Sequence, residues 1–346
     1  MMWLFINHRD IYHPKAGGAE QVLYEILKRF PINTYWLSEK VKGKPSYEQL
    51  DNIKFIRKGG KVSLHLYSPL YAKKAEVVVD SVAHAVPFFS YLVNKNAIAL
   101  VHHVHQQVVK YELNPILAEL VKTAEKRLKS YKHLISVSNT TKQDLIKLGI
   151  ESEKIQVIYN GIDHEKFYPG VKSDVPMIFW IGRMMKYKNP LDIIEIKRKT
   201  KSKVKFVVAG TGELSEEFKI LANKEGIKYL GRISEKEKVK LLQSSWMILS
   251  TSFIEGWGMT IVEANACGTP ALGYNTGSIP EVIKPEKNGF LVNYKDFEMA
   301  AKIIDYISED ENIMKELSNS SYISSLQYDW NKTSKQYFDY IVSAVK

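Results

Sequence analysis

The chain has 346 residues, of which 45% are apolar, and this is enough to build two hydrophobic cores. Its single cysteine, Cys267, excludes an internal disulfide and a cysteine metal cluster, and it fits a reducing compartment. No signal peptide is recognisable, because the apolar run at residues 2–7 ends in His8-Arg9-Asp10, and no uncharged stretch suits a bilayer span. We therefore expect a cytoplasmic protein of two domains.

The net charge of +11 is unevenly distributed, since residues 1–165 carry 23 Lys and Arg against 16 Asp and Glu. Part of this excess lies on a helix predicted over residues 113–130, whose apolar positions recur at helical spacing. The helix could pack on the core with a solvated basic face. Alternatively its cations could attract an anionic membrane or a phosphate-bearing acceptor, at about 1 kcal/mol for each one near acidic lipid. The cations are Lys122, Lys126, Arg127, Lys129 and Lys132.

Short apolar runs alternate with amphipathic stretches, which predicts parallel sheets with helices on both faces. In the first half, helices are expected at 19–30, 113–130 and 140–148. The strands expected there are residues 2–7, 53–56, 76–80, 97–101, 133–137 and 155–159. Those expected in the second half are residues 177–181, 203–209, 227–230, 246–250, 270–274 and 289–292.

Between the halves, residues 160–176 contain helix and strand breakers such as Gly161 and Pro169. The pattern therefore predicts an α/β chain of two Rossmann-like, doubly wound domains that face each other across a cleft, residues 1–165 and 166–329. The last segment, residues 330–346, has an apolar side that needs a partner, and we expect it to complete the first domain. In such sheets a ligand lies beyond the carboxyl ends of the strands.

Paired glycines follow the first predicted strand in Ala16-Gly17-Gly18-Ala19-Glu20, where a helix opens. Glycines at a helix N-terminus let main-chain amides face a phosphate or sugar oxygen, although Gly-Gly also forms plain turns. The chain has neither a G-x-G-x-x-G motif nor a P-loop, which argues against a nicotinamide dehydrogenase and a P-loop kinase.

Three histidines, His102, His103 and His105, follow the strand at 97–101. No Asp, Glu or Cys accompanies them at a familiar ligand spacing, so we expect hydrogen-bonding imidazoles and no metal. Alternation along an extended chain places His103 and His105 on one face and His102 on the other.

Two carboxylates, Glu255 and Glu263, flank a turn between the strand ending near residue 251 and a helix starting near Thr260. Gly256 and Gly258 allow close backbone approach, and the helix N-terminus suits an anion, so a sugar nucleotide could lie here. Alternatively, Thr260-x-x-Glu263 is a capping box and Glu255 is an ordinary loop acid.

A pair of cations, Arg183 and Lys188, follows the strand at 177–181. Beside a pyrophosphate seated on a helix, they would neutralise a departing nucleoside diphosphate without a metal, and the D-x-D pair of metal-dependent sites is absent from the chain. Alternatively they are surface charges. Gly182, directly before Arg183, is a further donor-binding candidate, and open backbone for a base or ribose is expected after the next two strands, at Gly210, Gly212 and Gly231-Arg232.

Taken together, these motifs resemble the retaining glycosyltransferases of family 4, also called glycosyltransferase group 1, from about residue 3 to about residue 340. The resemblance implies two Rossmann-like domains in the glycosyltransferase B (GT-B) arrangement. It implies a UDP-sugar or GDP-sugar donor held mostly by the second domain and no obligatory metal or other cofactor. It further implies transfer of a hexose-type sugar to a glycan, glycolipid or lipid-linked acceptor.

The resemblance also assigns roles to single residues. Arg183 and Lys188 would bind the diphosphate and stabilise the leaving group, Glu255 would face the sugar, and Glu263 would bind the ribose. The strand-end histidine would be His102 or His103, with the choice left open. Main chain at Gly17, Gly18, Gly256, Gly258, Met259 and Thr260 would contact phosphates and sugar. The implied mechanism is same-face substitution in which the departing phosphate takes the acceptor proton.

Two other interpretations compete with a transferase. A nucleotide-sugar epimerase of the same fold would need no acceptor. The chain could instead be a non-catalytic basic protein that binds nucleic acid or an anionic membrane. That interpretation does not explain the two carboxylates or the cation pair, and no aromatic stacking platform accompanies the basic residues. We expect no nucleic-acid partner. Residues 64–71, flanked by Lys61 and Lys73-Lys74, are either an acceptor or membrane contact or an ordinary buried connection.

Overall fold

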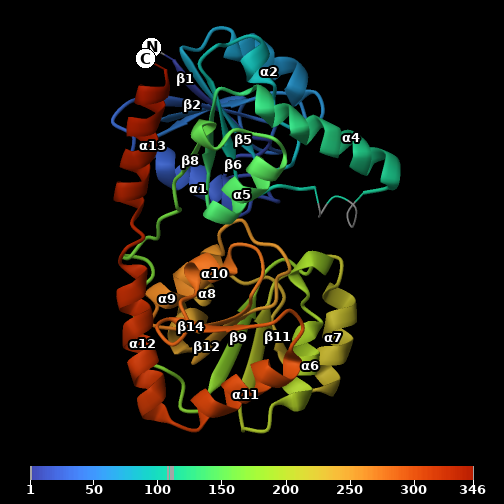
Figure 1. Ribbon diagram of the computed structural model, residues 1–346, viewed down its shortest axis with the longest axis vertical. Coiled ribbons are helices and arrows are strands. Elements are labelled where there is room, and N and C mark those ends of the chain that lie inside the picture. Colours follow the sequence, from blue (N-terminus) through green and yellow to red (C-terminus); the bar gives the residue numbers. More distant parts are fainter. Residues whose placement is uncertain (1, 107–108, 110–112, 346) are drawn as a thin grey trace. The chain divides into compact units, whose positions relative to one another are not determined.

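The computed structural model describes residues 2–106, 109 and 113–345, and the chain divides into two units (Figure 1). Unit 1 comprises Met1–Gly161 and Trp330–Lys346, and unit 2 comprises Ile162–Asp329. The first division lies slightly before the expected one at residue 165. Among the described residues, no helix is both long and apolar enough to cross a bilayer.

The unit 1 sheet has the order β3-β4-β2-β1-β5-β6-β7-β8; β3 runs antiparallel to β4, and the other neighbouring pairs are parallel. Two strands were not expected, β2 and β3. The β3 strand is a polar edge strand with no buried position, so its sequence carries no core signal. The strands are β1 Trp3–Ile6, β2 Thr34–Ser38, β3 Tyr47–Leu50, β4 Ile53–Arg57, β5 Val77–Val82, β6 Ala97–Val101, β7 His133–Ser136 and β8 Ile155–Val157.

The helices of unit 1 include one from the far end of the chain. Helix α13 packs on α1, where Trp3 stacks on Phe338 with ring centroids 5.3 Å apart and the Ser334 hydroxyl donates to the Ile26 carbonyl at 2.8 Å. The C-terminal segment thus contacts the first domain, as its apolar side predicts. The helices are α1 Gly18–Leu27, α2 Leu64–Ala72, α4 Pro115–Glu125, α5 Asn139–Lys147 and α13 Trp330–Ala344, with 3₁₀ turns η1 Ser90–Leu92, η2 Lys126–Ser130 and η3 Ser152–Lys154.

Helix α4 corrects the prediction for residues 113–130. It starts at Pro115 because the Asn114 side chain caps it, accepting from the Leu117 amide at 2.9 Å, and η2 replaces its last turn. The apolar side expected to pack on the core is exposed, with Ile116 at 76% and Leu120 at 62% of their full accessible area. The prediction that this face packs on the core is therefore wrong for α4, where only Ala118 and Glu125 are buried, whereas Leu128 of η2 does lie in the core.

The unit 2 sheet is parallel throughout, in the order β11-β10-β9-β12-β13-β14. Helix α6 packs with α11, while α9 packs with α8 and α12, so helices cover both faces (Figure 1). The strands are β9 Met177–Ile181, β10 Lys205–Ala209, β11 Lys228–Tyr229, β12 Met247–Ser250, β13 Ala271–Tyr274 and β14 Gly289–Val292. The helices are α6 Asp192–Lys199, α7 Ser215–Lys224, α8 Glu235–Ser244, α9 Met259–Ala266, α10 Ile279–Val282, α11 Phe297–Ser308 and α12 Glu311–Ser325, with the 3₁₀ turn η4 Lys186–Lys188.

Each sheet reverses its strand order at one point. In unit 2 the chain proceeds outward from β9 through β10 to β11 and then returns to β12 on the other side of β9. In unit 1 the same reversal separates β1 from β5. Ligands of doubly wound sheets bind beyond the carboxyl ends of the strands at such a reversal. The loops after β9 and β12, and those after β1 and β5, are therefore the places to look for a site.

Candidate functional site

The reversal point of unit 2 brings together the cation and the carboxylate predicted to act there. The Lys188 ammonium, in η4 after β9, pairs with the Glu255 carboxylate, in the loop after β12. The Ser252 hydroxyl donates to the same carboxylate at 2.7 Å. The Lys188 and Glu255 side chains are 18% and 16% exposed, so solvent or a ligand can still reach both.

The backbone around Lys188 is held in place by side chains that sequence reasoning missed. The Asn189 amide donates to the Thr251 carbonyl at 3.0 Å, and the Thr251 hydroxyl donates to the Lys188 carbonyl at 2.8 Å. Trp180 of β9 donates from its indole nitrogen to the same hydroxyl at 3.0 Å. Asn189 has a φ of +45°, a left-handed conformation that asparagine tolerates. These bonds tie the β9 loop to the β12 loop and so fix the lysine.

The loop after β13 holds the main chain of the Glu255 segment. The Ser278 hydroxyl donates to the Glu255 carbonyl at 2.9 Å, and the Thr276 hydroxyl donates to the Ser252 carbonyl at 2.8 Å. Gly277, with a φ of +54°, lies so close that a Cβ there would be 3.0 Å from the Glu255 nitrogen. A third strand end thus contributes to the site, through small hydroxyl residues that carry no recognisable motif.

Among the described residues, neither of the other predicted cations pairs with Glu255, although the Lys188 ammonium also lies 5.6 Å from the centre of the Tyr187 ring. Arg183 is exposed, and its guanidinium bonds the Tyr187 hydroxyl and lies 5.7 Å from the centre of that ring. Arg232, after β11, is also exposed. The structure therefore joins Lys188 to Glu255 directly and leaves Arg183 beside the same loop, free to reach a ligand.

The two glycines after β10 are required by close packing between loops, which the sequence did not reveal. A Cβ on Gly210, whose φ is +136°, would lie 1.8 Å from the Gly182 carbonyl oxygen, and one on Gly212 would lie 2.5 Å from that of Met184. The Leu214 amide, after the same turn, also donates to the Met184 carbonyl at 3.0 Å. These glycines bring the β10 loop against the β9 loop. Their contact with a base or ribose stays a prediction.

In the part of the chain that the structure describes, the first amides of α9, which follow Glu255 in the same loop, have no hydrogen-bond partner. Gly258, with a φ of +79°, is the residue before the helix, and the Ile261 amide donates back to its carbonyl at 2.9 Å. The amides of Met259 and Thr260 precede that bond, so they are available to an anion, which the helix dipole also favours. Gly256 lies in the same loop, between Glu255 and the helix.

Glu263 does not form the capping box that its spacing with Thr260 allows. It is the fifth residue of α9, is buried, and accepts from the Lys238 ammonium at 3.0 Å, while Lys238 also lies 3.1 Å from Glu235. Burial raises the pKa of the Glu263 carboxyl above its usual value. Burial alone would lower the pKa of Lys238, but Glu263 and Glu235 outweigh it and raise that pKa. The partner Lys238 was not foreseen, because it comes from α8.

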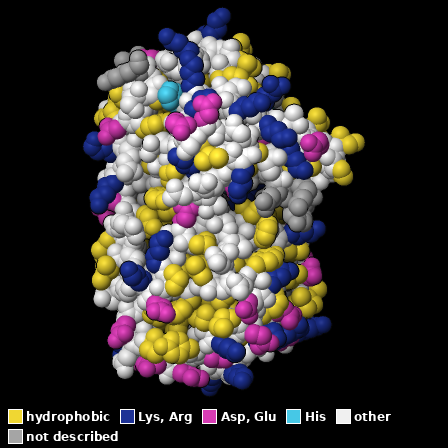
Figure 2. Space-filling view, viewed as in Figure 1, with side chains coloured by type: hydrophobic (Ala, Val, Ile, Leu, Met, Phe, Trp, Pro, Cys, Tyr) yellow, Lys and Arg dark blue, Asp and Glu magenta, His cyan; other side chains and the backbone are white. Residues whose placement is uncertain are grey.

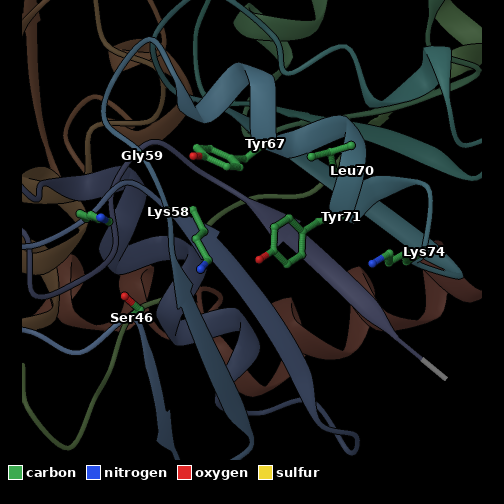
Figure 3. A pocket seen from close by; sticks show the side chains of 8 residues that line it. Ser46, Lys58, Gly59, Tyr67, Leu70, Tyr71 and Lys74 are labelled. Carbon is green, nitrogen blue, oxygen red and sulfur yellow. The ribbon is translucent and has the colours of Figure 1, made fainter.

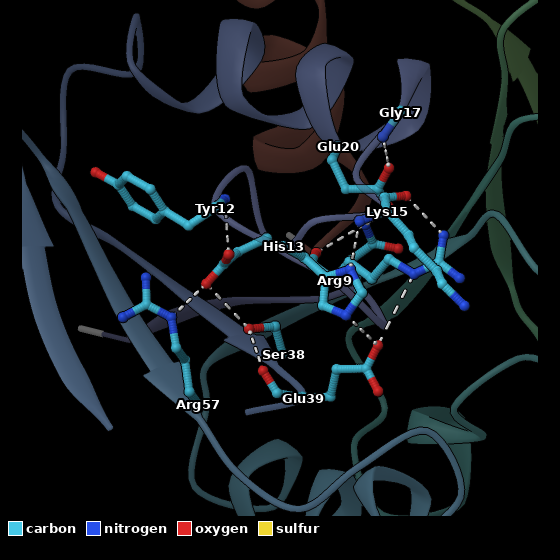
Figure 4. A network of polar contacts seen from close by, with 11 residues as sticks. Arg9, Tyr12, His13, Lys15, Gly17, Glu20, Ser38, Glu39 and Arg57 are labelled. Atoms are coloured by element: carbon cyan, nitrogen blue, oxygen red, sulfur yellow. Dashed lines mark hydrogen bonds and ion pairs between the residues drawn. The ribbon is translucent and has the colours of Figure 1, made fainter. Parts of the chain in front are cut away.

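In unit 1 the paired glycines open α1 as expected. The loop before them is tied down by Asp10, which accepts from the Arg57 guanidinium at 2.5 Å and from the Tyr12 amide at 2.9 Å (Figure 4). The Gly17 amide donates to the Glu20 carboxylate at 2.7 Å. A Cβ on Gly18 would meet nothing within 4 Å, so no packing contact requires glycine there. Open space at a helix N-terminus leaves room for a ligand atom.

The strand-end histidines occupy different environments. His102 is buried, its Nε2 lies 3.1 Å from the Ser81 hydroxyl, and burial lowers its pKa to about 4. His103 and His105 lie on the same side, with ring centroids 3.8 Å apart, as strand alternation predicts. His105 contacts Glu125 of α4 at 3.2 Å. Within residues 2–106, 109 and 113–345, no three His, Cys, Asp or Glu side chains are placed to hold a metal ion.

Sequence reasoning missed a second group of histidines at the reversal point of unit 1. His8 follows β1 and His84 follows β5, with ring centroids 5.2 Å apart, and His65 of α2 lies 5.1 Å from His8. Burial lowers the pKa of His8 to about 3 and that of His84 to about 2. These imidazoles are therefore neutral at physiological pH. Their positions directly after strands could have indicated them.

The matching protein families cover almost the whole chain. The family described as "Glycosyltransferase Family 4" matches residues 16–166, and the family described as "Glycosyl transferases group 1" matches residues 162–323. The junction of the two matches lies close to the boundary between units 1 and 2.

Curated relatives are similar over part of their length. An uncharacterized glycosyltransferase of Methanocaldococcus jannaschii is 26% identical over 225 residues, which are 59% of this chain and 58% of the relative. The N,N'-diacetylbacillosaminyl-diphospho-undecaprenol alpha-1,3-N-acetylgalactosaminyltransferase of Campylobacter jejuni is 26% identical over 220 residues, with the same two shares. The matches thus span a little over half the length of these relatives.

Solved structures match the whole chain at low identity. Sucrose-phosphate synthase from Thermosynechococcus elongatus has a TM-score of 0.83 at 16% identity and covers 99% of this chain and 98% of its own. Anabaena HepE in complex with UDP and glucose has a TM-score of 0.79 at 18% identity, with 99% and 100% covered. At this identity the likeness establishes the fold.

Proposed function

The chain belongs to the group 1 glycosyltransferases and shares their GT-B fold, and we propose that it is a retaining, metal-independent enzyme for a hexose-type sugar. The donor would be a nucleoside-diphosphate sugar. The observation that carries the proposal is the pairing of Lys188 with Glu255 at the reversal point of the unit 2 sheet, beside the free amides of α9. A cation, a carboxylate and an anion seat within one loop cluster match the charges of such a donor.

The diphosphate would lie on the amides of Met259 and Thr260, where the dipole of α9 favours negative charge. Lys188 would exchange the Glu255 carboxylate for a phosphate oxygen, and Arg183 would swing from Tyr187 to the other phosphate. Two cations and preorganised amides stabilise a departing diphosphate without a metal ion. UDP and GDP are both compatible with this arrangement, because no base contact is involved.

The two carboxylates would bind the two sugars of the donor. Glu255, released from Lys188, would accept from hydroxyls of the transferred hexose. Glu263 would accept from the ribose hydroxyls, and Lys238 would keep it ionised despite burial. Buried carboxylates satisfied by a single ammonium retain acceptor capacity for further hydroxyl donors.

Retention of the anomeric configuration would follow from a same-face substitution. The acceptor oxygen bonds to the anomeric carbon, the bond from that carbon to the phosphate oxygen breaks, and the departing diphosphate takes the acceptor proton. A histidine with a pKa near 4, such as His102, is neutral and would act as a hydrogen-bonding group. A product of inverted configuration, determined by NMR of the glycoside, would contradict this mechanism.

The acceptor would be a glycan, a glycolipid or a sugar on a lipid carrier. The names of two relatives, the C. jejuni transferase above and an alpha-1,3-galactosyltransferase of Escherichia coli, specify acceptors linked to diphosphoundecaprenol. The basic excess of residues 1–165 supports a position at an anionic membrane surface, where such an acceptor resides.

A thermal-shift screen tests the donor assignment. UDP, GDP, ADP and their common sugar conjugates are added in the presence of EDTA to wild type, Arg183→Ala and Glu263→Gln. A nucleotide at 100 times its dissociation constant adds about 2.7 kcal/mol to the stability, so the midpoint rises visibly. We expect one base to stabilise wild type and neither variant. The proposal would be contradicted if no nucleotide raised the unfolding midpoint and only polyanions did.

A further inference from the structure

A pocket of about 420 Å³ opens on unit 1 beside α2, and none of its lining residues is among those assigned to donor binding (Figure 3). Its walls come from α2, from the loop after β4, and from the segments after β2 and before β3. The lining residues are Lys40, Ser46, Lys58, Gly59, Tyr67, Leu70, Tyr71 and Lys74.

The charge of this pocket is positive, and the Lys58 ammonium also lies 5.1 Å from the centre of the Tyr47 ring. Three of its lining residues are lysines and none is acidic. In the part of the chain that the structure describes, none of the three lysines is in an ion pair. Figure 3 shows the Lys58 side chain and the Tyr71 hydroxyl directed into the same space, with Lys74 on the far side of Tyr71. Ammonium and hydroxyl groups around an open space are donors for phosphate oxygens.

The geometry of α2 explains why these groups converge. Tyr67, Leu70 and Tyr71 lie within one turn of α2, and Lys74 follows two residues after the last residue of the helix. The facing loop approaches closely because of Gly59, whose φ is +63° and where a Cβ would lie 2.6 Å from the Ser63 hydroxyl. The pocket is therefore a formed feature of the fold.

An apolar stripe borders the pocket along α2 and the turn before it. Val62, Leu66 and Leu70 follow one another at four-residue spacing and are 80%, 75% and 63% exposed. Leu70 belongs to both the stripe and the pocket wall. Residues 64–71 lie in this helix, which buries Leu64 and Ser68 and exposes Leu66 and Leu70, so the segment is buried on one side only, and its role as an acceptor or membrane contact stays a prediction. Figure 2 shows Lys and Arg side chains beside hydrophobic ones over this part of unit 1.

We propose that this pocket binds the phosphate group of an anionic membrane lipid while the apolar stripe enters the bilayer interface. Lys40, Lys58 and Lys74 bind the phosphate oxygens, and the stripe beside them lies where the acyl chains begin. Binding of a free phosphate would involve the lysines but would not explain why Val62 and Leu66 are exposed. The inference rests on the membrane setting of the proposed acceptor. Its test needs neither donor nor acceptor, so the two proposals fail separately.

The experiment is co-sedimentation of the full chain with vesicles of phosphatidylglycerol and phosphatidylcholine, compared with phosphatidylcholine alone. We expect binding to the anionic vesicles only. The triple variant Lys40→Gln/Lys58→Gln/Lys74→Gln should bind roughly a hundredfold more weakly, at about fivefold for each lysine near an acidic surface. The variant Leu66→Ser/Leu70→Ser should also bind at least tenfold more weakly, because apolar burial contributes to interfacial binding.

A matched control separates the pocket from net charge. Lys219→Gln/Lys224→Gln/Lys228→Gln removes the same charge from exposed positions of unit 2 and should bind the anionic vesicles like wild type. Equal weakening by both triple variants would overturn the proposal in favour of unspecific attraction. Unchanged binding by the pocket variant would overturn it as well. So would full vesicle binding by the leucine variant together with displacement by millimolar inorganic phosphate, since the ligand would then be a soluble phosphate.

Discussion

The reversal points of the two sheets differ in how they handle charge. In unit 2, Lys188 and Glu255 form an ion pair whose loops are held by hydroxyl and amide side chains from three strand ends. In unit 1, the corresponding place holds His8 and His84, whose pKa values burial lowers far below neutrality. The same fold thus provides one edge with an ion pair that solvent can reach and another where the ion pair of Asp10 with Arg57 is fully buried beside neutral imidazoles.

The glycines of the two edges differ in the same way. Gly210 and Gly212 have no space for a side chain, because they bring one loop of unit 2 against another. Gly18 of unit 1 has open space around it. A glycine motif can therefore indicate either close packing within the protein or room for a ligand, and only the surroundings distinguish the two.

The largest effect expected from this contrast is on stability. Gly210→Ala should destabilise unit 2 by about 5 kcal/mol, because its Cβ would overlap a backbone oxygen and its φ of +136° is unsuited to alanine. Gly18→Ala should change the unfolding free energy by less than about 1 kcal/mol, since it opens a helix where alanine is favourable. Urea denaturation of both variants measures this. Similar midpoints for the two would contradict the packing role assigned to Gly210.

The buried pair of unit 2 gives the next effect. Lys238→Met should cost about 3 to 5 kcal/mol, because it leaves the Glu263 carboxylate buried without its partner. The double variant Lys238→Met/Glu263→Gln should recover most of that loss. A double-mutant cycle from urea denaturation gives the coupling, and additive effects would show that the two side chains do not depend on each other.

The catalytic contrast is tested at Lys188. Lys188→Ala should lower kcat/KM on the order of 10² to 10³-fold, the effect of removing one preorganised group from a developing negative charge. Lys186→Ala removes an exposed lysine from the same short 3₁₀ turn and is the matched control. Initial rates of nucleotide release with donor and acceptor provide the comparison. Equal losses in both variants would indicate that the loop charge matters and the Glu255 partner does not.

The smallest effect concerns His102, a buried histidine of unit 1 that follows β6. Burial lowers the pKa of His102 to about 4, below the value near 6.5 of an unfolded histidine, so the unfolded chain binds the additional proton. Its contribution to stability is complete above pH 6.5 and is lost as the pH falls toward 4. Between pH 7 and pH 5 this loss is about 2 kcal/mol.

His102→Gln serves as the control, because glutamine can still contact the Ser81 hydroxyl but does not titrate. The drop in urea midpoint from pH 7 to pH 5 should be smaller in this variant than in wild type. An identical drop in both proteins would show that His102 is not a source of acid sensitivity.

The elements that the sequence predicted well are those with strong local signals. The strands β6, β9 and β14 begin and end where their apolar runs do, and the cation and carboxylate of the site follow their strands directly. Lys188 and Glu255 meet because parallel strands place their carboxyl ends at one edge, which strand assignment alone implies.

The features that sequence reasoning missed depend on contacts between distant segments. Thr251, Ser278 and Lys238 act through partners on other elements, and single hydroxyl or lysine residues have no motif. The predicted capping box does not form because α9 starts at Met259, and Glu263 contacts Lys238 of α8 instead. The apolar side of α4 has helical periodicity, but periodicity states which residues share a side and not what covers it.

Calorimetric titration of UDP and GDP in EDTA tests the central claim, that the Lys188 and Glu255 cluster of unit 2 is a metal-independent donor site. One of the two nucleotides should bind wild type and Lys186→Ala equally and should bind Lys188→Ala about tenfold more weakly or worse, as expected for a lost charge-assisted contact of about 1.5 to 3 kcal/mol. Equal binding by Lys188→Ala, or binding that appears only when a divalent metal is supplied, would contradict it.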